Sequence, residues 1–147
     1  MNSFSLKKFR EIVLQLLFSI DMGGAEEEDL IPFLMHELKT TRKIVKEAYA
    51  QASGIYAKRE SLDQKIALLS QSYAFERIGR VERNILRWGF FEQDGGLLDK
   101  AVVISEAIRL ARKFSTPESA DYVNALLDAP PPLETPCCPS PTSEISL

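Results

Sequence analysis

The sequence predicts an all-α fold, and three observations lead to this. Apolar residues recur at helical spacing through most of the chain. Glycine pairs and a proline separate these stretches, at Gly23-Gly24, Gly95-Gly96 and Pro117. The length of 147 residues suits one domain, or two small halves that share a core. We therefore expect six or seven helices, arranged as two antiparallel three-helix bundles that pack together.

The first predicted helix, over residues 4–20, carries the clearest apolar stripe. Ser3 or Ser5 can cap its start, and Gly23-Gly24 ends it. Its apolar residues recur at the helical period and define the side that faces the core. They are Phe9, Ile12, Val13, Leu16, Leu17 and Ile20.

Three further helices are expected before residue 77. The acidic run 26–29 suits the N-terminus of a short helix that ends near Leu38. Another helix should span residues 41–56, and the capping-box pattern of residues 61–64 should open the next one.

The predicted helix over residues 77–92 is apolar on two sides. Leu86 and Phe90 lie about 100–140° around the helix axis from the other stripe, which consists of Val81, Ile85 and Trp88. A helix of this kind is either central in the core or committed to a partner.

Two more helices complete the domain, which we place at residues 1–128. The first spans residues 98–114, and the second begins near Pro117 because proline suits the first helical turn. Asn124 is expected to be a hydrogen-bonding core residue. The inward positions of the longer helix are Ala101, Ile104, Ala107, Ile108 and Ala111.

Residues 129–147 differ in composition from the rest of the chain. Six of the eight prolines lie between Pro130 and Pro141, and neither lysine nor arginine occurs after Lys113. Such a segment cannot build a core, so we expect a disordered tail.

Composition and N-terminal sequence favour the cytoplasm. The chain has no run of 18 apolar residues, so we expect no membrane span. The start Met1-Asn2-Ser3-Phe4 does not have the form of a secretory signal. The adjacent Cys137 and Cys138 fit no disulfide framework.

Nothing in the sequence predicts enzymatic chemistry, a cofactor or a metal site. The only histidine, His36, has apolar neighbours and is expected to be structural. The two cysteines lack a second pair at metal-ligand spacing, and no glycine-rich phosphate loop occurs. The net charge of −3 is unusual for a nucleic-acid-binding domain, so RNA binding would need a local basic patch or a partner.

The first helix carries a candidate nucleic-acid surface. Lys7, Glu11, Leu14 and Phe18 form a second stripe, which we place opposite the core stripe, and Lys8 and Arg10 flank the core stripe. This pattern is typical of a base-stacking platform beside phosphate contacts. The alternative is that Phe18 packs against another helix.

Three ordered blocks of sequence resemble the NusB family of bacterial transcription antitermination factors. The blocks are residues 81–87 (VERNILR), 103–114 (VISEAIRLARKF) and 119–128 (SADYVNALLD). The resemblance extends over about residues 7–128. It implies an all-helical protein that binds the boxA element of nascent RNA and pairs with NusE, a ribosomal protein of the small subunit.

The resemblance also implies two RNA-contacting regions. Members of the family open with an arginine-rich segment and a helix that ends in Gln-x-Leu-Tyr. This chain matches with Lys7, Lys8, Arg10, Gln15 and Phe18. Lysine in place of arginine loses the bidentate fork, and phenylalanine in place of tyrosine loses the hydroxyl, so weaker intrinsic RNA affinity is expected.

The second implied RNA region is the start of the last helix. Its candidate residues are Lys113, Phe114, Glu118 and Tyr122. The free N–H groups of a helix N-terminus attract phosphate, and the two aromatic rings could stack on bases, whereas Glu118 would oppose a phosphate. The alternative is that Phe114 is a core residue and Thr116 simply caps the helix.

For the protein partner, the resemblance implies the helix over residues 77–92. The candidate residues are Glu82, Arg83, Leu86 and Phe90. An apolar pair bordered by charges is typical of an interface with a polar rim. The alternative is that Leu86 and Phe90 pack within the domain.

The resemblance therefore predicts a factor that holds boxA-like RNA jointly with NusE, within the antitermination complex of RNA polymerase, chiefly on ribosomal RNA operons. Two alternatives stay open. One is a protein-interaction module with little RNA binding, which the acidic balance favours. The other is a NusB-like domain related to those of ribosomal RNA cytosine methyltransferases. The proline-rich terminus argues against this second alternative.

Overall fold

The computed structural model describes residues 6–23, 26–70, 75–96 and 98–129, and within them it contains seven α-helices, one short 3-10 helix and no strand. The all-α prediction is confirmed. The elements are α1 (Leu6–Asp21), α2 (Glu27–Leu38), α3 (Arg42–Ala57), α4 (Arg59–Leu69), η1 (Phe75–Arg77), α5 (Arg80–Gly95), α6 (Lys100–Phe114) and α7 (Pro117–Asp128). The predicted caps Ser3 and Ser5 and the predicted tail from residue 130 onward lie outside the described residues.

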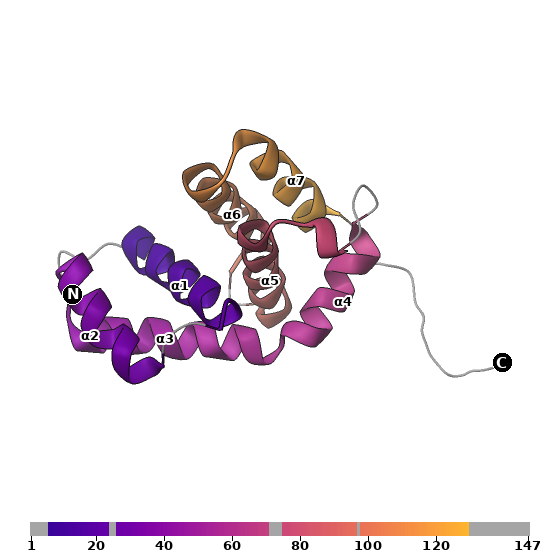
Figure 1. Cartoon of the computed structure of the whole chain (residues 1–147). Coiled ribbons are helices and arrows are strands. Elements are labelled where there is room, and N and C mark those ends of the chain that lie inside the picture. Colours follow the sequence, from indigo (N-terminus) through magenta and orange to yellow (C-terminus); the bar gives the residue numbers. More distant parts are fainter. Residues whose placement is uncertain (1–5, 24–25, 71–74, 97, 130–147) are drawn as a thin grey trace.

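The helices form two packed groups of three, as expected. In one group, α1 and α2 pack on α3; in the other, α5, α6 and α7 pack on one another (Figure 1). Helix α4 continues from α3 and packs on α5, and α1 also packs on α5. The two groups therefore share one core.

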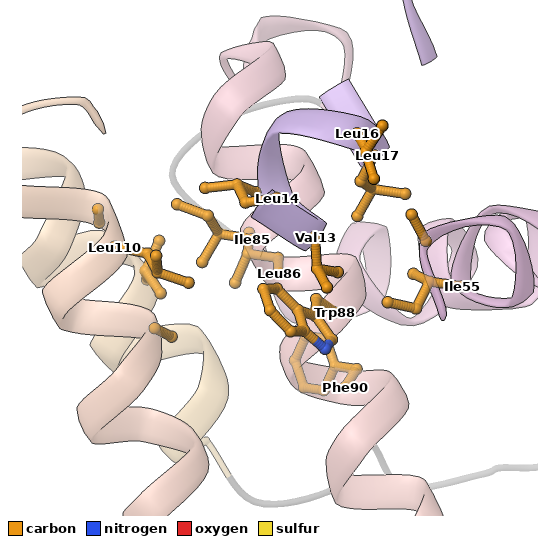
Figure 2. Close-up of a cluster of buried hydrophobic side chains, with 14 of the residues drawn as sticks. Val13, Leu14, Leu16, Leu17, Ile55, Ile85, Leu86, Trp88, Phe90 and Leu110 are labelled. Carbon is orange, nitrogen blue, oxygen red and sulfur yellow. The ribbon is translucent and has the colours of Figure 1, made fainter. Parts of the chain in front are cut away.

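Helix α5 is central in that core. All seven residues from Asn84 to Phe90 are buried. Figure 2 shows that Ile85, Leu86 and Trp88 lie among side chains from α1, α3 and α6. A helix with two apolar sides needs neighbours that cover both of them, and here α1, α3, α4, α6 and α7 all pack on α5.

Gly89 permits the close approach of α5 and α7. A Cβ at this position would lie 2.7 Å from Cδ2 of Leu127. Real Cβ atoms do not come so near a methyl group, so a side chain at residue 89 would force Leu127 or one of the helices to shift.

A buried charge network ties the two groups together at Arg87. Its guanidinium donates to Asp63 of α4 at 2.7 and 2.8 Å and lies 3.3 Å from a carboxylate oxygen of Asp21, the last residue of α1. The amide of Asn84 donates to Asp21 at 3.3 Å. Only 3% of Arg87 is exposed, so its partners replace the water that it loses on burial.

Three details of the sequence prediction were wrong. Helix α4 begins at Arg59 rather than at the capping box of residues 61–64, because only Lys58 separates it from α3 and the two helices run nearly into each other. Ala101 and Asn124 are exposed rather than inward-facing, because they lie beside an open groove between α6 and α7.

Candidate nucleic-acid interface

A small pocket brings together residues from both predicted RNA regions. Its volume is about 300 Å³, and it lies between α1, the start of α5 and the end of α6. We call it the aromatic pocket; its lining residues are Leu14, Gln15, Phe18, Ser19, Val81 and Phe114. Phe18 and Phe114 are far apart in the sequence, so only the fold makes them neighbours.

The aromatic rings of the pocket differ in how they are held. Phe114 is half-buried and packs against the main core. The alternative that Phe114 is a core residue is therefore partly correct. Phe18 is half-buried as well but does not belong to the core cluster, and Gln15 beside it is exposed. A ring that the fold holds in place but that does not pack in the core can stack on a base.

The second stripe of α1 does not face solvent as a whole, and this part of the prediction was wrong. Leu14 and Glu11 are buried, with 3% and 9% of their surface exposed. The reason is that α1 is covered on two sides, by α3 and by α5 together with side chains of α6. Only Lys7 at one end is fully exposed.

Glu11 of α1 binds two basic side chains of α6. Its carboxylate accepts from Arg109 at 2.8 Å and from Lys113 at 3.1 Å. Burial raises the pKa of Glu11, but the hydrogen bonds and charges of Arg109 and Lys113 outweigh burial and lower the pKa below its ordinary value. Lys113 is itself exposed, as the predicted phosphate contact requires.

Arg10 is not placed as a phosphate contact, and that prediction was wrong. Its guanidinium donates to Glu92 at 2.7 and 2.9 Å and lies 3.2 Å from Glu106. It also stacks on the indole of Trp88, 4.4 Å from the ring centroid. With 8% exposure, Arg10 holds α1 on α5 and α6 rather than facing solvent. Lys7 and Lys8 are exposed, as the RNA prediction requires.

Thr116 caps the start of α7, which confirms that part of the alternative. Thr116 accepts a hydrogen bond from the backbone N–H of Ser119 at 3.0 Å, which is the N-cap arrangement. Glu118 is exposed. Tyr122 is half-buried and its hydroxyl lies 2.7 Å from Oγ of Ser70, so this ring is anchored between α7 and α4.

The predicted partner surface on α5 is not an open apolar face. Leu86 is 0% and Phe90 2% exposed, so the alternative that they pack within the domain is correct. Lys65 of α4 covers the Phe90 ring, 4.9 Å from its centroid. Glu82 and Arg83 are half-buried; Arg83 donates to the carbonyl of Ile78 at 3.1 Å, and Glu82 accepts hydrogen bonds from the α6–α7 corner.

A second opening is a groove of about 760 Å³ along α6 and α7. Half-buried Ile104 and Ile108 line it together with Ala101, and Arg112 is exposed at its edge. The sequence predicted these apolar residues to face inward, so helical spacing could not reveal the groove.

Other candidate chemistry is limited. Among the described residues, no group of three or more histidine, cysteine or acidic side chains could hold a metal ion. His36 is exposed, and Cys137 and Cys138 lie outside the described residues. No described helix is both long and apolar enough to cross a membrane.

Several residues of the site were absent from the sequence prediction. Val81 and Ser19 line the aromatic pocket, and Arg109 joins Lys113 on Glu11. The spacing of Arg109 and Lys113, one helical turn apart, could have indicated a shared acidic partner. The sequence has no signal that pairs Val81 with Phe18, because they come from different helices.

Comparison with known proteins identifies the family. The NusB family model matches residues 7–130. A transcription antitermination protein NusB of Chlamydia pneumoniae is 36% identical over 128 residues, which cover 86% of this chain and 80% of that protein. The NusB protein of Nitratiruptor sp. is 36% identical over 120 residues, covering 82% and 86%. The solved structure of T. maritima NusB superposes with a TM-score of 0.70 at 25% identity, covering 87% of this chain and 90% of that one. The chain therefore belongs to the NusB family, and both of these relatives are named transcription antitermination proteins.

Proposed function

We propose that this protein is a transcription antitermination factor that binds boxA-like RNA jointly with NusE. The observation that supports this most is the aromatic pocket, where Phe18 and Phe114 lie together with the exposed amide of Gln15. Exposed Lys7 and Lys8 on α1 and exposed Lys113 on α6 supply positive charge on two of the three helices that line the pocket. Aromatic faces with nearby cations suit a single-stranded RNA.

The proposal is for joint rather than independent binding because the basic residues are few. The chain carries a net charge of −3, and Arg10 is ion-paired with Glu92 and Glu106. Glu11 also forms ion pairs with Arg109 and Lys113 of α6. Neutralising phosphates drives most RNA affinity, so a protein with few free cations gains from a partner that contributes contacts.

This function is tested by titrating a fluorescent boxA-like RNA with the protein, in about 0.1 M salt, with and without NusE. We expect weak binding by the protein alone, markedly tighter binding with NusE, and little binding of a scrambled RNA of equal length in either case. Affinities that are equal with and without NusE would contradict joint binding. Equal affinities for the two RNAs would contradict boxA-like specificity.

A second candidate is a protein-interaction module with little RNA binding. The α6–α7 groove supports it, because the apolar residues Ile104, Ile108 and Ala101 line an opening of about 760 Å³. This candidate would be favoured if the protein binds NusE but its affinity for NusE is the same with and without RNA.

A further inference from the structure

The carboxylate of Glu82 is directed into the protein rather than toward a partner. It accepts hydrogen bonds from the hydroxyls of Ser115 and Ser119, which lie at the corner between α6 and α7. The two hydroxyl oxygens are 3.0 Å apart, and Thr116 donates to Ser119 at 3.1 Å. We call Glu82, Ser115 and Ser119 the corner latch.

The ionisation of Glu82 agrees with this geometry. Burial raises the pKa of its carboxyl, but the hydrogen bonds from Ser115, Ser119 and its own backbone N–H outweigh burial and lower the pKa. The carboxylate is thus charged and accepts charge-assisted hydrogen bonds at neutral pH, and such bonds are stronger than those between neutral groups.

Gly79 provides the space that the carboxylate occupies. A methyl group at this position would overlap Oε1 of Glu82. The backbone of Gly79 has φ −57° and ψ 151°, which any residue can adopt, so the nearest obstacle to a side chain there is the carboxylate of Glu82. Gly79 and the corner latch therefore form one arrangement.

The corner latch spans the aromatic pocket. Val81 directly precedes Glu82, and Phe114 directly precedes Ser115; both line the pocket, on α5 and α6 respectively. The bond from Glu82 to the corner therefore connects two walls of the pocket and sets the spacing between them.

We propose that Glu82 is a positioning residue for RNA binding, which acts by holding the Phe114 wall of the aromatic pocket against the Val81 wall. This inference rests on the proposed RNA function. It assigns Glu82 a role different from the partner contact that the family resemblance implies.

The test compares three ways of opening the latch in the full chain: Glu82→Ala, the double variant Ser115→Ala/Ser119→Ala, and Gly79→Ala, which displaces the carboxylate without changing it. Each should weaken boxA-like RNA binding in the presence of NusE by roughly fivefold to tenfold, the loss expected when one charge-assisted bond no longer orders the site. Combining Glu82→Ala with the serine substitutions should add little, because all act on one contact.

Two further measurements separate positioning from partner contact. Affinity for NusE without RNA should be unchanged in the serine and glycine variants. The NMR signals of the Val81 methyls and the Phe114 ring should move in all three variants, but not in Glu60→Ala, which removes an exposed glutamate on α4. Glu82→Gln, which keeps one acceptor oxygen, should restore part of the RNA affinity.

The proposal is overturned if Glu82→Ala weakens NusE binding while the serine and glycine variants bind RNA and NusE normally. It is also overturned if the Val81 and Phe114 signals stay in place in the serine variant. Failure of the wild-type protein to bind RNA would instead contradict the proposed function, and the NMR signals would still report whether the corner latch positions the pocket walls.

Discussion

Phe18 is the residue on which the RNA proposal depends most. It lines the aromatic pocket beside Gln15 but lies outside the main core cluster, unlike Phe114. Its ring can therefore contact a ligand without unpacking the protein. The neighbouring second-stripe residue Leu14 is buried, so the two positions separate binding from stability.

We predict that Phe18→Ala weakens RNA binding in the presence of NusE by roughly tenfold, since a stacked base contributes about 1–3 kcal/mol. The melting temperature should fall only slightly. Phe18→Tyr should bind at least as well as the wild type, and Leu14→Ala should lose about 2–5 kcal/mol of stability, as core truncations do. A large loss of stability in Phe18→Ala with no RNA-specific defect would make Phe18 a core residue.

Asp21 is a second informative residue because its side chain is buried against three partners. Arg80 lies 3.1 Å from it, Arg87 3.3 Å and the Asn84 amide 3.3 Å. Burial raises its pKa, but the charge of Arg87 and the hydrogen bonds of Arg80, Arg87 and Asn84 outweigh burial and lower the pKa below its ordinary value.

A lowered folded-state pKa means that Asp21 stabilises the fold fully above its unfolded pKa, and that this contribution is lost as the pH falls through the folded value. We predict that Asp21→Asn lowers the free energy of unfolding at pH 7 by about 3 kcal/mol, because Arg87 keeps a buried charge with one partner fewer. The difference from wild type should shrink below about pH 4. Urea unfolding at several pH values measures it, and a difference independent of pH would contradict the ion-pair explanation.

At the scale of the elements, α5 organises the molecule because it contacts both groups of helices. Its approach to α7 depends on Gly89, where a Cβ would lie 2.7 Å from Leu127. Helix α3 contains a contrasting glycine: Gly54 is exposed, and a Cβ there would meet nothing within 4 Å.

These two glycines make a matched pair of variants. Gly89→Ala should destabilise the protein by about 1–3 kcal/mol, because Leu127 or the helix must move. Gly54→Ala should instead stabilise it by about 0.5–1 kcal/mol, because alanine costs less entropy in a helix interior. Thermal or urea unfolding compares them. Equal effects of the two substitutions would mean that the α5–α7 approach does not depend on residue 89.

At the scale of the whole molecule, the helical domain accounts for the candidate site, and the proline-rich terminus is expected to add nothing to it. Helix α7 ends at Asp128, and residues 130–147 contain no lysine or arginine that could contact a phosphate.

We predict that a chain ending at Ala129 has the same melting temperature, RNA affinity and NusE affinity as the full chain. The tail lacks the apolar content to offset the entropy of ordering it, and its acidic residues Glu134 and Glu144 could only repel RNA weakly. A melting temperature lower by several degrees, or weaker RNA binding, would show that the tail docks on the domain.

The sequence by itself determined the fold class, the order of the helices and the family. Helical period, glycine breaks and the proline at the start of α7 are local properties, and local backbone preferences decide where helices begin and end. Some bounds differ from the prediction. Helix α4 begins early, where only Lys58 separates it from α3, and α5 covers Arg80–Gly95 rather than residues 77–92.

Only the tertiary structure decided which side of each helix is covered. Helical spacing gives the angle of a side chain around its own axis, but it does not say which neighbour lies at that angle. For this reason Leu86 and Phe90 were equally compatible with an interface and with the core, and Arg10 with a phosphate contact and with Glu92. The aromatic pocket and the corner latch join α1 or α5 to the α6–α7 corner, and such contacts between distant segments exist only once the chain has folded.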